Sequence, residues 1–106
     1  MSGLGDMRTR LAFEKAVDAP DGAGGAARTF NAIADVWGAL EPVSGRAAFV
    51  AAREELKVTH RIRIRWRNDV EIADRFRQLD RIFIVRGLLD PDERRVILEC
   101  LCEEIV

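Results

Sequence analysis

The strictest constraint on this chain is an alternating segment near its middle. Between Val58 and Arg67 the sequence reads VTHRIRIRWR, so apolar side chains and arginines take turns. One face would carry Val58, His60, Ile62, Ile64 and Trp66, and the other Thr59, Arg61, Arg63, Arg65 and Arg67. A period of two is typical of a strand with one buried face, and a slip of one residue would bury four arginines. The segment therefore predicts a half-buried strand of fixed register.

Two more strands are expected before this segment. Apolar and polar residues alternate within 7–17, and an apolar run covers 33–40. Pro42 ends that run, because proline cannot donate to a strand ladder. The glycine-rich segment 19–27 has little to bury and is expected to form a mobile loop, and residues 1–6 a flexible N-terminus.

One short helix is expected in the connection that follows Pro42. Residues 44–56 are rich in alanine, and Phe49, Ala52 and Leu56 fall on one face at helical spacing. Ser44 is a suitable N-terminal cap, because its hydroxyl can accept a hydrogen bond from a free backbone N–H. This segment is the best helix candidate in the first two thirds of the chain.

The second half again predicts strands joined by turns. Phe76 and Leu79 indicate a short strand, and a tight turn at 79–81 leads into the apolar strand 82–85. Gly87 is a candidate β-bulge, since a glycine inside a strand often marks one. Another turn is expected at Asp90-Pro91-Asp92.

The C-terminal segment 90–106 fits two structures. Asp90, Pro91 and Glu93 resemble a helix capping box, and the apolar residues after them could form a helical stripe. As a strand, the same segment would place Val96, Leu98, Cys100 and Cys102 on one face and Glu99 and Glu103 on the other. The local pattern slightly favours the helix.

Charge limits the possible partners. The 106 residues fit one domain, and 17 basic and 18 acidic side chains nearly cancel, unlike in a strongly basic nucleic-acid binder. The charges are unevenly placed, because 57–67 is basic and 90–106 is mainly acidic. Such opposite fields suit self-association or a charged partner, but also two adjacent strands or a solvated face.

Few residues suggest catalysis or metal binding. His60, the single histidine, falls on the apolar face of the arginine strand and fits a core or rim position better than a general base. Cys100 and Cys102 fall short of the four ligands of a structural zinc site and are expected to be buried thiols without a disulfide. We expect no catalytic, cofactor-binding or metal-binding residue.

Membrane association is not expected either. The first ten residues have no apolar signal-peptide core, and no apolar run approaches the roughly 18 residues of a membrane span. The sequence thus predicts a protein that is made and used in solution.

The arginine row is the most distinctive candidate site. Its guanidinium groups could bind phosphates, or carboxylates on an adjacent strand or subunit, or simply face solvent. Glu99 and Glu103 are the candidate carboxylates, if the last segment is a strand. Base stacking would need aromatic residues on the arginine face, and Trp66 lies on the other one.

Three stretches together resemble a known family. They are 36–46 (VWGALEPVSGR), 59–67 (THRIRIRWR) and 89–104, which begins LDPDERR and ends LECLCEE. Their order and spacing resemble the head–tail joining, or head-closure, proteins of tailed phages and gene transfer agents. The resemblance covers about Met7 to Val106. Asp80 stands where the family usually has a hairpin glycine, and Gly38 where alanine is common.

The resemblance implies a small, closed or partly open antiparallel β-barrel with one short helix, in which the C-terminal segment is a strand. It implies a homo-oligomeric ring, a dodecamer or hexamer, in the neck of a virion or phage-like particle assembled in the host cytoplasm. The expected neighbours are a portal or adaptor ring, a tail terminator or tail-completion protein, and DNA that passes without sequence-specific binding.

Specific residues follow from this hypothesis. We expect Arg61, Arg63, Arg65, Glu99 and Glu103 to contact subunits or partners, and Arg46 and Arg53 to face the lumen. Arg63→Glu is then expected to leave heads and tails unjoined. The alternative is a small nucleic-acid-binding barrel that uses the arginine face and binds DNA with steep salt dependence. A small enzyme dependent on His60 is the third hypothesis.

Overall fold

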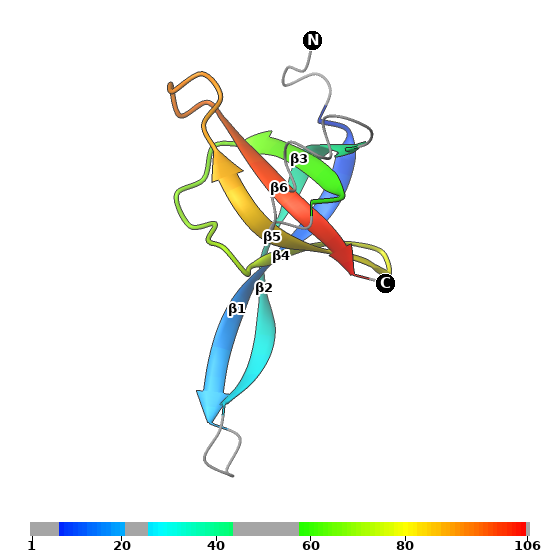
Figure 1. Ribbon diagram of the computed structural model, residues 1–106, viewed down its shortest axis with the longest axis vertical. Coiled ribbons are helices and arrows are strands. Elements are labelled where there is room, and N and C mark those ends of the chain that lie inside the picture. Colours follow the sequence, from blue (N-terminus) through cyan, green and yellow to red (C-terminus); the bar gives the residue numbers. More distant parts are fainter. Residues whose placement is uncertain (1–6, 21–25, 44–57, 106) are drawn as a thin grey trace.

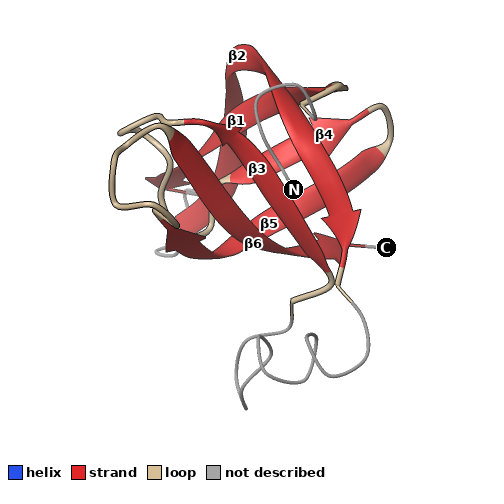
Figure 2. Ribbon diagram, turned by 90° about the horizontal axis from the view of Figure 1, so that it is seen from above, coloured by secondary structure: helices blue, strands red, loops and turns tan. Residues whose placement is uncertain are grey.

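The computed structural model describes residues 7–20, 26–43 and 58–105, which form a closed antiparallel barrel of six strands. The strands are β1 (Thr9–Pro20), β2 (Ala26–Pro42), β3 (His60–Arg65), β4 (Arg75–Gln78), β5 (Arg81–Leu89) and β6 (Ile97–Ile105). Their order around the barrel is β1-β2-β3-β6-β5-β4, and Figure 2 shows the wall closing. The expected mainly β barrel is confirmed. The described residues contain no helix, and the one predicted at 44–56 lies outside them.

The alternating segment forms β3, as its period predicted. Ile62 and Ile64 are fully buried, while Arg61 and Arg63 lie on the outer side of the wall. β3 pairs with β2 on one side and with β6 on the other. A slipped register would place arginine side chains in the apolar core, so burial alone fixes this strand.

The core fills the barrel interior with side chains from five of its strands and one connection. Phe13 of β1 and Phe76 of β4 pack ring against ring, with centroids 5.5 Å apart. The other core members are Leu11, Ile62, Ile64, Val70, Phe83, Val85, Leu98, Cys100 and Cys102. These side chains hold the strands in one arrangement, which positions the polar groups on the outside.

The C-terminal segment is a strand, as the family resemblance implied and the local pattern did not. Leu98, Cys100 and Cys102 are buried at every second position of β6, and Glu99 faces outward. Val96 was expected on the buried face, which is wrong: β6 begins one residue later and Val96 is 48% exposed. Its carbonyl instead accepts a hydrogen bond from Trp66 N–H at 2.9 Å.

Two predicted irregularities have clear outcomes. The register of β5 against β6 shifts between Val85 and Gly87, which confirms the bulge. β4 ends at Gln78, so Leu79, expected in that strand, belongs to the following turn and is 88% exposed. Leu79, with a φ of 54°, is the left-handed residue of this turn, and Asp80, at the family's hairpin-glycine position, has no positive φ.

β1 and β2 continue past the barrel as a two-stranded arm, which projects downward in Figure 1. β4 pairs with β1 only at residues 12–14, and β3 pairs with β2 only from Gly38 onward. The arm strands pair with each other out to Pro20 and Ala26. They thus extend into both ends of the loop predicted at 19–27, and 21–25 lie outside the described residues.

A partly buried ion-pair network fixes the base of this arm. Lys15 Nζ donates to Asp74 Oδ2 at 2.7 Å and to Glu71 Oε1 at 2.9 Å. Burial opposes the charge on Lys15, but its hydrogen bonds to Asp74 and Glu71 outweigh that effect and raise its pKa. Asp74 is 2% exposed and also accepts the N–H of Ala16 at 3.0 Å. The arm is therefore held to the 66–74 connection where it leaves the barrel.

Candidate interaction surface

The first two members of the arginine row are neutralised within the chain. Arg63 Nε donates to Glu99 Oε1 at 3.2 Å, and its Nη1 contacts Glu41 on β2. Arg61 Nε lies 3.0 Å from the same Glu99 oxygen, without hydrogen-bond geometry, so that contact is ionic. Glu99 lies between the two arginines because β6 is the neighbour of β3, with Arg63 directly opposite Glu99. We call Glu41, Arg61, Arg63 and Glu99 the Glu99 cluster.

Arg67 does not belong to the row, contrary to the prediction. β3 ends at Arg65, so the alternation that should have aligned Arg67 with the others stops there. Arg67 turns back and donates to both oxygens of Asp69 at 2.9 and 2.8 Å, with its guanidinium 5.3 Å from the Phe13 ring centroid. The hydrogen bond from Arg67 lowers the pKa of Asp69, although partial burial opposes this.

Arg65 differs from its neighbours in the row. It is exposed, and within the described residues it makes no hydrogen bond or ion pair. Its partner across the β3–β6 ladder is Ile97, which carries no charge. Of the arginines predicted for an interface, Arg65 is therefore the one that offers an available cation at the surface.

Glu103 has a different partner from the one expected. It accepts both Nε and Nη2 of Arg86 at 3.1 and 2.8 Å, and it does not contact the arginines of β3. Glu104 similarly accepts Arg81 Nε at 2.8 Å. Neither pair was predicted from the sequence, because the β5–β6 register that brings them together depends on the bulge at Gly87.

His60 sits at the rim of the core, as expected. Its ring packs edge-on against Phe83, with centroids 5.1 Å apart, and its Nε2 lies 3.9 Å from Glu104 Oε1. Burial lowers the pKa of His60 and nearby Arg81 adds to that effect, while Glu104 opposes it. The described surroundings of His60 hold no serine or cysteine hydrogen-bonded to it; its Nδ1 faces the hydroxyl of Thr59 at 3.0 Å.

The two thiols are buried and free, as predicted. Cys100 and Cys102 are both 0% exposed on the inner face of β6. Burial raises the pKa of Cys102 to about 12 and raises that of Cys100 well above its usual value. Within the described ranges no group of three or more potential ligands could hold a metal ion.

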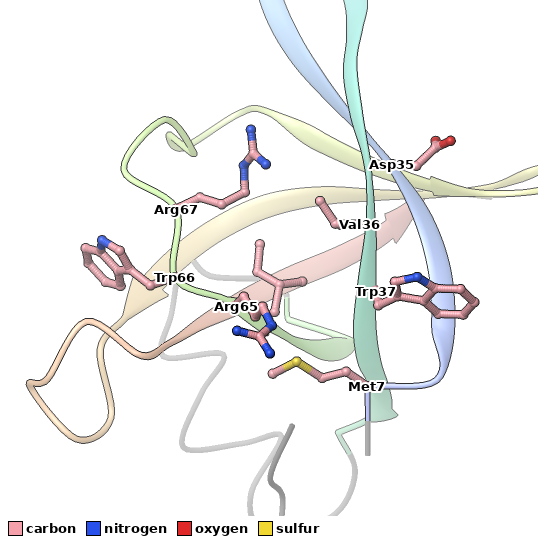
Figure 3. Close-up of a pocket in the computed structure, with 8 residues that line it drawn as sticks. Met7, Asp35, Val36, Trp37, Arg65, Trp66 and Arg67 are labelled. Atoms are coloured by element: carbon pink, nitrogen blue, oxygen red, sulfur yellow. The ribbon is translucent and has the colours of Figure 1, made fainter. Parts of the chain in front are cut away.

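An open hollow lies where β2 and β3 part. The two strands pair only as far as Gly38 opposite Ile64, and beyond this pair they diverge. The resulting β2–β3 notch has a volume of about 480 Å³ and is lined by Met7, Asp35, Val36, Trp37, Ile64, Arg65, Trp66 and Arg67. Figure 3 shows the guanidinium of Arg65 between the two tryptophans, close to Met7. A second hollow of about 240 Å³ shares Trp66 and Arg67 with the notch and includes Leu89.

The notch brings together residues that the sequence did not connect. Trp37 is 58% exposed, which is unusual for tryptophan because this large side chain is highly buried on average. Trp66 is half-buried. Tryptophan and arginine are the residue types that most often dominate protein–protein interfaces. Arg46 and Arg53, the predicted lumen residues, lie outside the described part of the chain.

These features define a small closed barrel whose outer wall is neutralised by its own carboxylates, with an aromatic, cationic notch at one end. The chain belongs to the phage head completion protein family, whose model matches residues 3–105. Among the described residues, no helix has the length and apolar character needed to cross a membrane.

Two solved structures resemble the chain over nearly its full length. One is a solution structure of a protein from Shigella flexneri 2a, with 26% identity, a TM-score of 0.74 and coverage of 97% of this chain and 96% of the other. The second is a chain of the virion of a native gene transfer agent particle, with 28% identity, a TM-score of 0.69 and coverage of 93% and 96%. No curated protein matches the chain.

Proposed function

We propose that this chain is a structural, non-catalytic component of a virion or phage-like particle that joins the DNA-filled head to the tail. The observation that carries this proposal is the similarity to a chain of the gene transfer agent virion, at 28% identity over 93% of the residues. Membership of the phage head completion family supports the same role. The copies would form a homo-oligomeric ring at the neck, around a channel through which DNA passes.

The physical character of the barrel suits a ring subunit. Closure of the sheet leaves the barrel wall without free strand edges, and the ion pairs on its outside satisfy most of its charged groups locally. A formal net charge of −1 also suits a channel component, because tight phosphate binding would stop DNA from sliding.

The partners in this proposal are a second copy on each side, a portal or adaptor ring on the head side, and a tail terminator or tail-completion protein on the tail side. Repetition of one contact by rotational symmetry would close the ring. Arg65 and the tryptophans of the notch are the described residues best suited to contact such a neighbour.

The alternative is a small barrel that binds nucleic acid through the Arg61/Arg63/Arg65/Arg67 face. The observed ion pairs disfavour it, because Glu99, Glu41 and Asp69 already neutralise three of the four arginines. Arg65 alone would give a shallow dependence of DNA affinity on salt, near one counterion per protein. A gel shift across a salt series separates the two proposals, since steep salt-dependent binding by the monomer would favour the alternative.

The decisive experiment is electron microscopy of intact particles, with deletion of this chain as the genetic control. We expect density for the barrel at the neck in the complete particle, and separate filled heads and tails in the deletion. Normal joined particles without this chain would refute the proposed role.

A further inference from the structure

The arm gives β2 a long strand edge that the barrel does not cover. Among the described residues, Arg28 to Trp37 pair with β1 on one side and with no strand on the other. Every second residue of such an edge points its N–H and C=O groups outward, so the edge can template the pairing of another strand. The barrel wall itself is closed, which makes this edge a distinctive opening in the sheet.

The sequence features that usually keep an exposed strand edge from pairing with another chain are few along this edge. The edge between Arg28 and Trp37 contains no proline and no lysine. Its bulge at Ile33, which opposes the step from Phe13 to Glu14 on β1, leaves an apolar side chain 50% exposed. Arg28 and Asp35 are already paired with Asp18 and Arg10 at 2.9 Å each, so neither adds an unbalanced charge. The edge therefore remains open to strand addition.

The same edge leads directly into the β2–β3 notch. Asp35, Val36 and Trp37 are at once the last unpaired part of the edge and one wall of the notch. Val36 and Ile64 line the notch with apolar surface, and the exposed Arg65 adds a cation to the same lining. A strand that pairs with this edge would thus place its end in the notch, where Val36 and Ile64 can contact one apolar side chain and Arg65 can bind one anionic group.

We propose that β2 binds an extended segment of another protein of the particle, which adds as a strand along Arg28–Trp37 and ends in the notch. The segment carries a carboxylate against Arg65, next to an apolar side chain in the hollow. Backbone hydrogen bonds supply affinity in this mode of recognition, and the notch supplies specificity. This inference rests on the proposed function, which brings the chain next to other particle proteins.

A second copy of this chain fits the edge less well. Two β2 edges paired antiparallel about their middle would bring Arg28 of each copy toward Arg65 of the other. Arg28 is already paired with Asp18 and brings no carboxylate of its own, so the Arg65 cation would stay without an anionic partner in that pairing. The occupant is therefore a different, acidic segment.

Hydrogen exchange on joined particles tests the strand addition. We expect alternate amides between Arg28 and Trp37 to exchange at least roughly tenfold more slowly in the particle than in the isolated chain, as one added hydrogen bond each implies. The amides of β5, which are paired in both states, serve as the internal reference. Equal exchange along the β2 edge in both samples would overturn the proposal.

Two substitutions test it independently. Ile33→Pro places a proline at the bulge residue, which has no partner in the β1 register; bulges tolerate proline, so the arm can persist while strand addition is hindered. Arg65→Glu removes the cation at the notch, with the exposed Arg94→Glu as the charge-matched control. We expect both test variants to lower the yield of joined particles tenfold or more, and Arg94→Glu to leave it unchanged. Normal joining by Arg65→Glu would refute the role of the notch.

The outcomes separate this inference from the proposed function. If the chain lies at the neck but its β2 edge exchanges freely, the joining role stands and the strand addition is wrong. If the chain is absent from joined particles, both proposals fail. Sedimentation of the isolated chain completes the test: we expect a monomer, and a dimer that Ile33→Pro abolishes would identify a second copy as the occupant and overturn the proposal.

Discussion

Gly38 is the position where one added methyl group should disturb the barrel most measurably. It lies on β2 opposite Ile64, next to the notch. A Cβ at this position would lie 2.9 Å from Leu11 Cδ1, 3.1 Å from the carbonyl oxygen of Arg63 and 3.1 Å from Ile64 Cγ2. The Leu11 methyl can move, but the Arg63 oxygen belongs to the β3 backbone and cannot.

Two opposing effects set the size of the change in Gly38→Ala. Overpacking a filled site costs about 1–3 kcal/mol, whereas replacing a strand glycine by alanine regains about 0.5–1 kcal/mol of backbone entropy. Overpacking wins, and we expect a net loss of about 0.5–2 kcal/mol in the free energy of unfolding. At this chain length each kcal/mol lowers the melting temperature by roughly 4 °C.

Gly87→Ala is the matched control. A Cβ there would meet its nearest neighbour, Leu101 Cδ1, at 3.4 Å, which is an ordinary contact. We expect this variant to be neutral or more stable by up to about 1 kcal/mol. Equilibrium urea unfolding compares both variants with the parent chain. A Gly38→Ala barrel as stable as the parent would show that the close distances do not limit the packing.

Leu11→Val adds a rescue, because valine has no Cδ1. Alone it should destabilise the barrel by about 1 kcal/mol, since Leu11 is fully buried. Combined with Gly38→Ala the losses should be less than additive, and strictly additive losses would locate the strain elsewhere. The family resemblance, in which this position is commonly alanine, is consistent with such a compensating change at a neighbouring residue.

Three further predictions concern the groups on the wall and in the core. Glu99→Gln leaves two arginines, 30% and 16% exposed, with the 43% exposed Glu41 as the one remaining carboxylate of the Glu99 cluster. We therefore expect a loss of about 2 kcal/mol in urea unfolding, and no loss would mean that solvent screens the cluster. Burial lowers the pKa of His60 below 6.5, so the unfolded chain binds the imidazole proton more tightly than the folded chain does. The contribution of His60 to the free energy of unfolding is therefore complete above pH 6.5 and falls as the pH drops through the lower folded-state pKa. His60→Gln should remove this pH dependence. Cys100 and Cys102 should react with a thiol reagent only as the barrel unfolds, since burial keeps both protonated at neutral pH, and rapid labelling of the native chain would contradict this.

How far the sequence could predict the fold depends on how strict each pattern was. β3 was predictable, because its alternation fits a single structure and a one-residue slip would bury charge. β6 was not, since Leu98, Cys100 and Cys102 fit a strand while the same segment also fits a helical stripe. Tertiary pairing with β3 and β5 decides between them, and no local pattern contains that information.

The candidate site was predictable only where it depended on direct neighbours. Glu99 was an expected partner of the arginine row, and its position opposite Arg63 bears out that interpretation. The notch could not be foreseen, because it exists only where β2 leaves β3 after Gly38. The end of β3 at Arg65 likewise separates Arg67 from the row, although the sequence alternates without a break.

Arg63→Glu, the substitution first suggested by the arginine row, is therefore a poor test of joining. It would place a third carboxylate beside Glu41 and Glu99, in a cluster where Arg63 is 16% exposed. Removing the partner of a largely buried charge costs about 3–5 kcal/mol, out of a typical total stability of about 5–15 kcal/mol. Much of the stability of the barrel would be lost, so a joining defect in this variant would not identify a contact of Arg63.

Arg65→Glu separates contact from stability. Arg65 is exposed and has no ion-pair partner among the described residues, so its substitution should change the free energy of unfolding by less than about 0.5 kcal/mol. We expect the melting temperature of Arg63→Glu to lie far below that of the parent chain, and that of Arg65→Glu to equal the parent's. Both variants should yield unjoined heads and tails. If Arg65→Glu melts normally and still joins, the arginine row acts only through the fold, and the interface must be sought on another face of the barrel.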